Sequence, residues 1–120
     1  MNFTKIVPSI FYADIQTGLK TFIDCLEFRI THEELNSANP YCVIEKDGLG
    51  ILLFENAEYA RQFSPEYRLV TNNIEEVHAR VSSGFPEMLH PNLSTITLRP
   101  WGAREFALVD GQIGVIVQQW

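Results

Sequence analysis

The chain has 120 residues, which is enough for one hydrophobic core and short for two independent ones. Hydrophobic residues make up 46% and charged residues 20%, so we expect a folded globular protein without disordered tracts. The net charge of −6, with Lys and Arg scattered along the chain, argues against a nucleic-acid partner and favours a neutral or cationic small molecule. The opening residues, which Pro8 and Asp14 interrupt, form neither a signal peptide nor a membrane span, so we expect no membrane partner and a cytoplasmic location.

The first half of the chain predicts a strand, a helix and three more strands. Residues 3–12 are rich in β-branched and aromatic side chains, and Pro8 makes this strand an edge or an exchange point. Asp14 is a plausible N-cap for a helix over residues 15–26, whose apolar residues recur at helical spacing. Asp47-Gly48 predicts a hairpin between the last two strands. These three strands are predicted at residues 28–32, 41–45 and 51–54.

A polar connection over residues 56–64, with room for one helical turn, separates this half from a second set of similar elements. A strand at residues 67–71 leads into a helix that Asn73 caps, with Glu76 completing a capping box and Gly84 as the stop. Further strands are predicted at residues 88–89, 94–98 and 103–109, with 114–119 as a fourth candidate.

The element order is therefore strand, helix and about three strands, repeated twice. We predict an α+β fold of two βαβββ modules in a single domain over residues 1–120, with module 1 at about 1–58 and module 2 at about 64–120. A ferredoxin-like fold is the main structural rival, but it has only two strands between its helices where this chain has three.

Two short features bear on chemistry. Cys25 and Cys42 lie in apolar stretches without CxxC spacing, so we interpret them as buried, reduced thiols. Arg99-Pro100-Trp101-Gly102 suits a type I turn, which places Trp101 at its apex. A large amphipathic ring in that position is either a lid over the core or a platform for a ligand, and the residues alone leave both interpretations open.

The segment Pro100-Trp101-Gly102-Ala103-Arg104-Glu105-Phe106-Ala107-Leu108-Val109-Asp110 closely resembles the PWG-x-REF-A-L-x-D signature of bleomycin-resistance proteins. These proteins belong to the vicinal oxygen chelate superfamily, together with glyoxalase I and the extradiol dioxygenases. Residues 6–10 with Asp14 resemble the opening strand and cap of that family, and Leu26-Glu27-Phe28 is similar to its LGF at the helix exit. The chain departs from the family where residues 110–114 replace the usual DPxGN turn.

The resemblance implies two βαβββ modules whose sheets curl into a half-open cup, usually completed by a second subunit. A homodimer with ligand clefts near its interface is therefore expected. In some members the first strand is exchanged between subunits around a proline, and Pro8 matches that proline in position.

Metal-dependent members of this superfamily place a His or Glu on each of four strands, so that several donors converge on one ion. The matching positions here are Val7, Leu52, Glu66 and Val117. Only Glu66 is a ligand-type residue, so we predict no metal and no other cofactor. The three histidines, His32, His78 and His90, are interpreted as surface or locally hydrogen-bonded residues.

Strand alternation, counted from these family positions, predicts a mainly apolar cavity with a few polar groups, as in small-molecule sites. The residues predicted to face it are Val7, Ser9, Leu52, Phe54, Arg68, Val117 and Gln119. We predict a metal-free protein of the antibiotic-resistance type that sequesters an organic ligand, such as a cationic drug like bleomycin, in a cleft at the dimer interface. The candidate ligand-binding residues are Trp101, Phe54, Arg68, Arg104, Ser9 and Gln119.

Several alternatives stay open at this stage. Arg104 could instead be a surface residue or pair with a nearby carboxylate such as Glu105, and Glu105 could be buried against a partner. The protein could be a lyase or dioxygenase with a metal held by displaced ligands, although the absence of ligand-type residues favours a non-enzyme. It could also be a structural or interaction subunit whose cup is filled by its own side chains.

Overall fold

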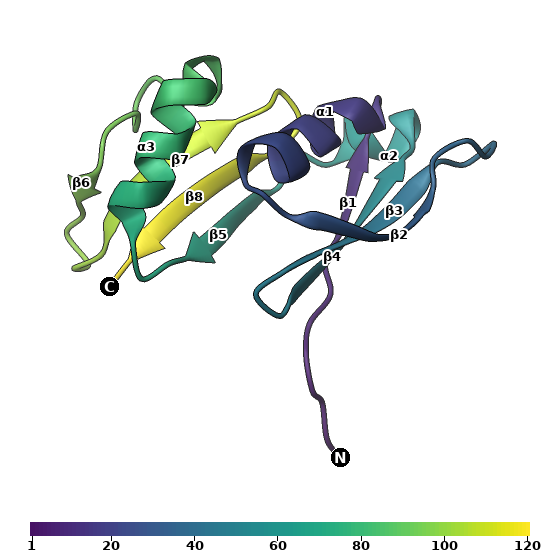
Figure 1. The fold of residues 1–120 in the computed structure, drawn as a ribbon, viewed down its shortest axis with the longest axis horizontal. Coiled ribbons are helices and arrows are strands. Elements are labelled where there is room, and N and C mark those ends of the chain that lie inside the picture. The colour runs from purple at the N-terminus through teal and green to yellow at the C-terminus, as the bar shows by residue number, and fades with distance from the viewer. The chain divides into compact units, whose positions relative to one another are not determined.

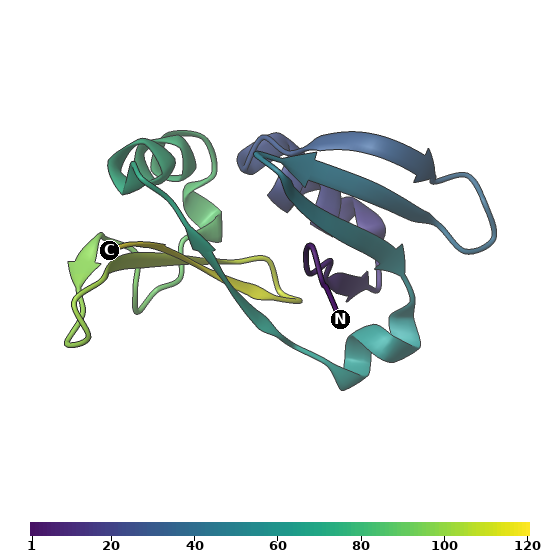
Figure 2. The ribbon, with the colours of Figure 1, turned by 90° about the horizontal axis from the view of Figure 1, so that it is seen from below.

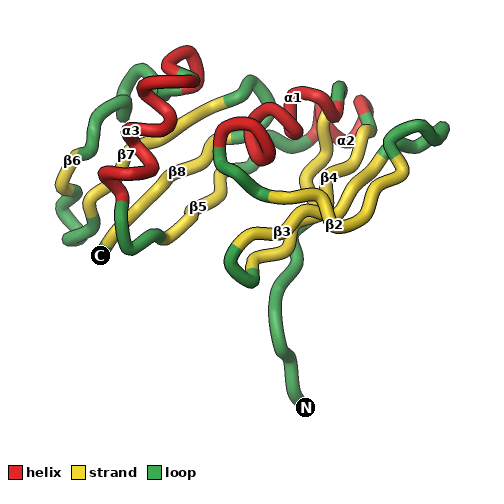
Figure 3. Tube along the Cα trace, viewed as in Figure 1, coloured by secondary structure: helices red, strands yellow, loops and turns green.

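The computed structural model describes residues 1–120 and divides them into two compact units, Met1–Phe63 and Ser64–Trp120 (Figure 1). Each unit contains one four-stranded mixed sheet and its own helices (Figure 3). The architecture is α+β with a strand, a helix and three strands in each unit, which confirms the predicted fold class. None of the helices combines the length and the hydropathy that a membrane crossing requires.

The sheet of the first unit has the strand order β1-β4-β3-β2, with β1 parallel to β4 and the other neighbours antiparallel. Its elements are β1 (Ser9–Tyr12), α1 (Ile15–Leu19), a π-helical turn (Lys20–Cys25), β2 (Arg29–Glu34), β3 (Tyr41–Lys46), β4 (Leu49–Glu55) and α2 (Ala57–Gln62). The hairpin between β3 and β4 turns at Asp47 and Gly48, which both have positive φ as a type I′ turn requires. The connection predicted after β4 contains α2, which Asn56 caps through a hydrogen bond from the Tyr59 amide.

The first strand is shorter than the sequence pattern predicts. Residues 3–8 are not in a strand, and β1 begins at Ser9, one residue after Pro8. The Pro8 carbonyl still accepts a hydrogen bond of 3.0 Å from the Leu52 amide, but proline has no N–H to extend a ladder. β1 is an edge strand, as predicted from Pro8.

The first helix begins where the sequence predicts. The Asp14 side chain accepts a 2.9 Å hydrogen bond from the Gln16 amide, and Ile15, Gly18 and Phe22 are buried along one face. The predicted single α-helix continues after Leu19 as a π-helical turn. The chain then leaves the helix through Glu27, which has the left-handed φ of 63° at the centre of the LGF-like tripeptide.

The sheet of the second unit repeats the first topology, with the order β5-β8-β7-β6 and β5 parallel to β8 (Figure 1). Figure 2 shows this sheet nearly edge-on, with the helix of the unit on one of its faces. Its elements are β5 (Glu66–Val70), α3 (Ile74–Gly84), a 3₁₀ turn (Pro86–Met88), β6 (Thr97–Leu98), β7 (Arg104–Val109) and β8 (Gly114–Gln119). The strand predicted at 88–89 is wrong: Pro86 starts the 3₁₀ turn, and only Leu89 forms an isolated bridge, with Leu108. The strand predicted at 94–98 shrinks to β6.

Asn73 caps α3 as predicted. Its side-chain oxygen accepts a 3.3 Å hydrogen bond from the Glu76 amide, and its side-chain nitrogen donates to the Glu76 carboxylate at 3.1 Å. Gly84 is the last helical residue, and the following residue, Phe85, ends α3 without a left-handed conformation. The start of α3 therefore matches the prediction more closely than its end does.

Each sheet has one face packed against the main helix of its own unit. The buried helix-side residues are Ile10, Tyr12, Ile44 and Leu53 in the first unit and Phe106, Leu108, Val115 and Val117 in the second. Because side chains alternate along a strand, their neighbours point to the other face. These second faces, away from α1 and away from α3, carry most of the candidate ligand-binding residues.

We expect Gly18→Ala to destabilise the fold. A Cβ at Gly18 would lie 2.5 Å from Cε2 of the buried Tyr12 ring, which is closer than real Cβ contacts allow. Overpacking of this kind costs about 1–3 kcal/mol, and the better helix propensity of alanine offsets up to about 1 kcal/mol of it. The urea midpoint should fall for this variant.

Gly84→Ala is the control, because its Cβ would meet nothing within 4 Å. Equal midpoints for both variants would show that the Tyr12 ring yields without cost.

Both cysteines are buried and form no disulfide, as predicted. Burial, with a smaller effect of Glu33, raises the pKa of the Cys42 thiol from 9.0 to about 11. The stability that the protonated Cys42 thiol contributes is therefore complete below pH 9.0 and is lost as the pH rises through about 11.

We expect iodoacetamide at about pH 8 to leave both thiols intact in the native protein and to alkylate both in denaturant, as mass spectrometry would show. Fast native alkylation would contradict this burial.

Candidate functional site

The turn that carries Trp101 forms as the sequence predicts. The Gly102 amide donates a 2.9 Å hydrogen bond to the Arg99 carbonyl, which leaves Pro100 and Trp101 at the two central positions. Gly102 has a φ of 99°, a conformation that glycine adopts without strain. The Trp101 residue is 49% exposed, so its ring is neither a core side chain nor free in solvent.

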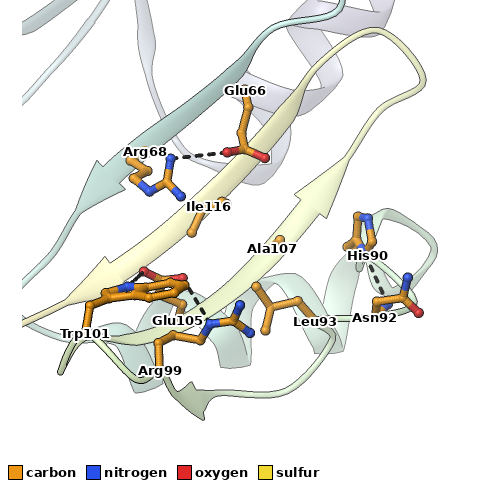
Figure 4. A pocket seen from close by; sticks show the side chains of 10 residues that line it. All are labelled: Glu66, Arg68, His90, Asn92, Leu93, Arg99, Trp101, Glu105, Ala107 and Ile116. Carbon is orange, nitrogen blue, oxygen red and sulfur yellow. Dashed lines mark hydrogen bonds and ion pairs between the residues drawn. The ribbon is translucent and has the colours of Figure 1, made fainter.

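Glu105 fixes the orientation of the Trp101 ring (Figure 4). Its Oε2 accepts a 2.9 Å hydrogen bond from Trp101 Nε1 and a 2.8 Å hydrogen bond from Gln118 Nε2. The guanidinium carbon of Arg99 lies 4.8 Å from the centroid of the Trp101 ring, a cation–π contact. Glu105 itself is only 1% exposed, so this carboxylate is a buried anchor for an exposed ring.

A pocket of about 320 Å³ lies on the face of the second sheet that points away from α3 (Figure 4). Strands β5, β7 and β8, the turn with Trp101 and the segment before β6 supply its walls. The lining residues are Glu66, Arg68, His90, Asn92, Leu93, Arg99, Trp101, Glu105, Ala107 and Ile116. The volume is at the lower end of the range for small-molecule sites, and a few polar groups among apolar ones are typical of them.

The structure brings three of the sequence-predicted residues into this pocket. Trp101 and Arg68 line it, and so does Glu66, whose Oε1 accepts a 3.1 Å hydrogen bond from Arg68 Nη1. His90 also lines the pocket, although no sequence pattern predicted it there, and its Nδ1 accepts a 3.0 Å hydrogen bond from the Asn92 amide. It precedes a proline in an irregular segment, and no periodic pattern indicates which way such a residue points.

Ser9 and Phe54 lie in the first unit, on the face of its sheet that points away from α1. Ser9 pairs with Leu52 in the parallel ladder of β1 and β4. Phe54 stacks with Phe11 at 5.4 Å between ring centroids and with Tyr41 at 5.9 Å. The sequence analysis did not select Phe11 and Tyr41. Strand alternation places Phe11 on the same face as Ser9, and the hairpin register places Tyr41 opposite Phe54, so both signals were present.

The prediction that Val117 and Gln119 face the same side as Arg68 is wrong. Arg68 pairs with Ile116 across the ladder of β5 and β8, so Val117 and Gln119 point toward α3. Val117 is buried there, and Gln119 Oε1 accepts a 2.8 Å hydrogen bond from the Ile74 amide at the start of α3. The prediction counted side-chain alternation from the metal position that the family resemblance implies at Val117, and a slip of one residue reverses every side chain in a strand.

Arg104 also points toward α3, where it forms an ion pair with Glu75. The hydrogen bond from Arg104 is the largest of the effects that lower the pKa of the Glu75 carboxyl. Glu105 is the next residue along β7 and points to the opposite face, so the alternative pairing of Arg104 with Glu105 is wrong. An exposed pair of this kind contributes little to stability.

The donor residues do not fit a metal centre of the kind that the superfamily's enzymes hold. Nowhere do three His, Cys, Asp or Glu side chains converge. Glu66 accepts a hydrogen bond from Arg68, and Glu105 already accepts two hydrogen bonds through Oε2. His78 and His32 are locally hydrogen-bonded, at 2.8 Å to the Ser94 carbonyl and 3.2 Å to the Tyr41 hydroxyl.

Comparison with known proteins shows the fold. No protein-family model matches the chain, and no curated protein matches its sequence. Solved structures do match over almost the whole length. The chain has the fold of the glyoxalase/bleomycin resistance protein/dioxygenase superfamily.

Three of these structures illustrate the match. A bleomycin-binding protein complexed with bleomycin superposes with a TM-score of 0.75 at 19% identity, over 98% of this chain and 99% of the other. A superfamily member from Sphaerobacter thermophilus superposes with a TM-score of 0.69 at 12% identity, over 98% of both chains. A lactoylglutathione lyase from Agrobacterium tumefaciens superposes with a TM-score of 0.74 at 11% identity, over 98% and 95%. Likeness at these identities extends to the fold and not to the ligand.

Gln119→Ala should separate a helix-capping role from a ligand-binding role. Loss of the hydrogen bond to the Ile74 amide should lower the free energy of unfolding by about 1 kcal/mol, measured by urea denaturation. Ligand affinity should not change, because Gln119 points toward α3. Gln62→Ala, a substitution on the exposed surface of α2, is the matched control. Weaker ligand binding at unchanged stability would restore Gln119 to the binding site.

Proposed function

We propose that the protein is a metal-free small-molecule-binding protein that sequesters an organic ligand by stacking it on Trp101. The observation that carries this proposal is the half-exposed indole ring, which a buried carboxylate holds in one orientation at the wall of a pocket. A ring fixed in this way loses little conformational freedom when a ligand stacks on it. Ala107, Leu93 and Ile116 provide apolar contact area beside it.

Binding is better supported than catalysis. The fold is shared by a bleomycin-binding protein and by a lactoylglutathione lyase, so the fold alone does not decide between them. The residues at the metal positions that the family resemblance implies argue for binding, because the side chains of Val7 and Leu52 have no donor atoms and Val117 points toward α3. The pocket instead combines an aromatic ring, apolar side chains and a few charged groups.

The finer parts of the proposal concern the ligand and the assembly. The net charge of −6 attracts a cationic organic compound, and a drug of the bleomycin type is the first to test. The role would then be antibiotic resistance by sequestration. We also propose a homodimer with the ligand cleft at its interface, as the resemblance to bleomycin-resistance proteins implies. Ser9 and Phe54 are proposed as further ligand contacts.

Titration with copper-free and copper-loaded bleomycin, followed by tryptophan fluorescence, tests the ligand. Ligand stacking should quench Trp101. Trp101→Ala should weaken binding roughly threefold to tenfold, which corresponds to the usual value of an aromatic contact, and calorimetry measures this because the variant lacks the fluorescent reporter. Trp120→Ala is the matched control, because Trp120 is also exposed but does not line the pocket. Its affinity should equal that of the unmodified protein.

Two results would count against the proposal. Equal weakening by both tryptophan variants would remove Trp101 as the stacking platform. No change in fluorescence at high micromolar bleomycin would remove bleomycin as the ligand.

A further inference from the structure

Two neighbouring polar atoms at the Trp101 pocket have no hydrogen-bond partner within the protein. They are Oε1 of Glu105 and Nε of Arg99, which lie 3.8 Å apart. The other carboxylate oxygen of Glu105 accepts two hydrogen bonds, from Trp101 and Gln118, so only Oε1 is available. Figure 4 shows Glu105 and Arg99 side by side at the Trp101 ring.

This arrangement is unusual for a buried charged group. Glu105 is 1% exposed, and buried polar atoms in native proteins are nearly always hydrogen-bonded. A distance of 3.8 Å is too long for a direct hydrogen bond between Arg99 Nε and Glu105 Oε1. The two atoms are complementary to a third group that lies beside both of them, accepts a hydrogen bond from Arg99 and donates one to Glu105.

The required group can be identified by its chemistry. An ammonium or amidinium group only donates hydrogen bonds, so it leaves Arg99 Nε unpaired and brings a positive charge next to a guanidinium. A carboxylate only accepts, so it leaves Glu105 Oε1 unpaired and faces a second negative charge. A neutral carboxamide has a carbonyl oxygen that accepts and an N–H that donates, side by side. It satisfies both atoms at once.

We propose that Arg99 and Glu105 are specificity-determining residues that select a neutral carboxamide on an aromatic ring stacked against Trp101. This inference rests on the proposed binding function and names the class of ligand. The negative net charge attracts a cationic molecule as a whole, whereas this pair selects the uncharged end of it. Positive charge on the ligand then lies outside this part of the pocket.

The ligand group reaches the two atoms from the pocket side of the turn. Both atoms are shielded from solvent, although their residues line the pocket. Arg99 and Trp101 lie in the segment between β6 and β7 and belong to neither strand. The Arg99 side chain is 34% exposed, so it can move outward when the amide enters.

Three planar probes of nearly equal shape test the proposal: 2-naphthamide, 2-naphthamidine and 2-naphthoate. Their affinities would be measured by quenching of Trp101 in a Trp120→Phe background, which removes the signal of the second tryptophan. We expect 2-naphthamide to bind about tenfold more tightly than either charged probe, because only the amide pairs both atoms. Its binding should also vary less with salt than that of the charged probes.

Glu105→Gln makes the test sharper because it should reverse the preference. The oxygen of the introduced amide can keep the hydrogen bonds from Trp101 and Gln118, and its nitrogen then replaces Oε1 with a donor. Two donors, one from Arg99 and one from the new amide, would face the ligand, so 2-naphthoate should become the best probe. Glu58→Gln, an equal change of charge on the exposed surface of α2 and outside the pocket, is the control and should leave the order of the three probes unaltered.

The outcomes separate this inference from the proposed function. Equal affinities for the three probes would overturn the inference, since a bridging water or a direct Arg99–Glu105 contact would then satisfy the pair, but ligand stacking on Trp101 would stand. Tightest binding of a charged probe would also overturn it. No quenching by any probe would overturn both proposals. The comparison of probes on the unmodified residues stands even if Glu105→Gln does not fold.

Discussion

The carboxylate of Glu105 is the contact on which the candidate site depends. It ties the indole of Trp101 to Gln118 through one oxygen atom, and thereby joins a surface turn to strands β7 and β8. A buried charge is costly unless its hydrogen bonds compensate for lost water, so this position tolerates a carboxylate only in this arrangement. The ring is therefore neither a simple lid nor a free platform. It is an exposed ring whose orientation is set by the buried carboxylate of Glu105.

The same contact shows how side chains on one face of a sheet can build a particular pocket without a change of fold. The face of the second sheet away from α3 carries an aromatic ring, two ion pairs and apolar contacts. The scaffold supplies two sheets with alternating faces. The identity of a few side chains on one face then decides what chemistry is possible.

Much of the fold could be predicted because its signals are local. Asp14 and Asn73 cap their helices within three residues, and Asp47-Gly48 specifies its hairpin without help from the rest of the chain. The Trp101 turn could likewise be predicted from Pro100 and Gly102. These features depend on backbone geometry that particular residue types favour, so the sequence pattern is enough.

The site was harder to predict because its geometry is set by pairing between distant strands. The side to which Gln119 points depends on the register of β8 against β5, and no local pattern in residues 114–119 specifies that register. The partner of Arg104 is Glu75, which lies in a helix on the far side of the sheet from Glu105. Trp101 could be predicted at the pocket from its turn, and Arg68 from its alternation with Glu66 along one strand.

The exit of the first helix has a consequence for how this sequence can change. Glu27 adopts a left-handed backbone that costs an ordinary residue roughly 1 kcal/mol and costs glycine almost nothing. The chain therefore carries a small, localised strain in the unit that does not contain the Trp101 pocket. A glycine there would raise the stability of the scaffold without touching the pocket, and that added margin would let the ligand-facing residues vary more freely.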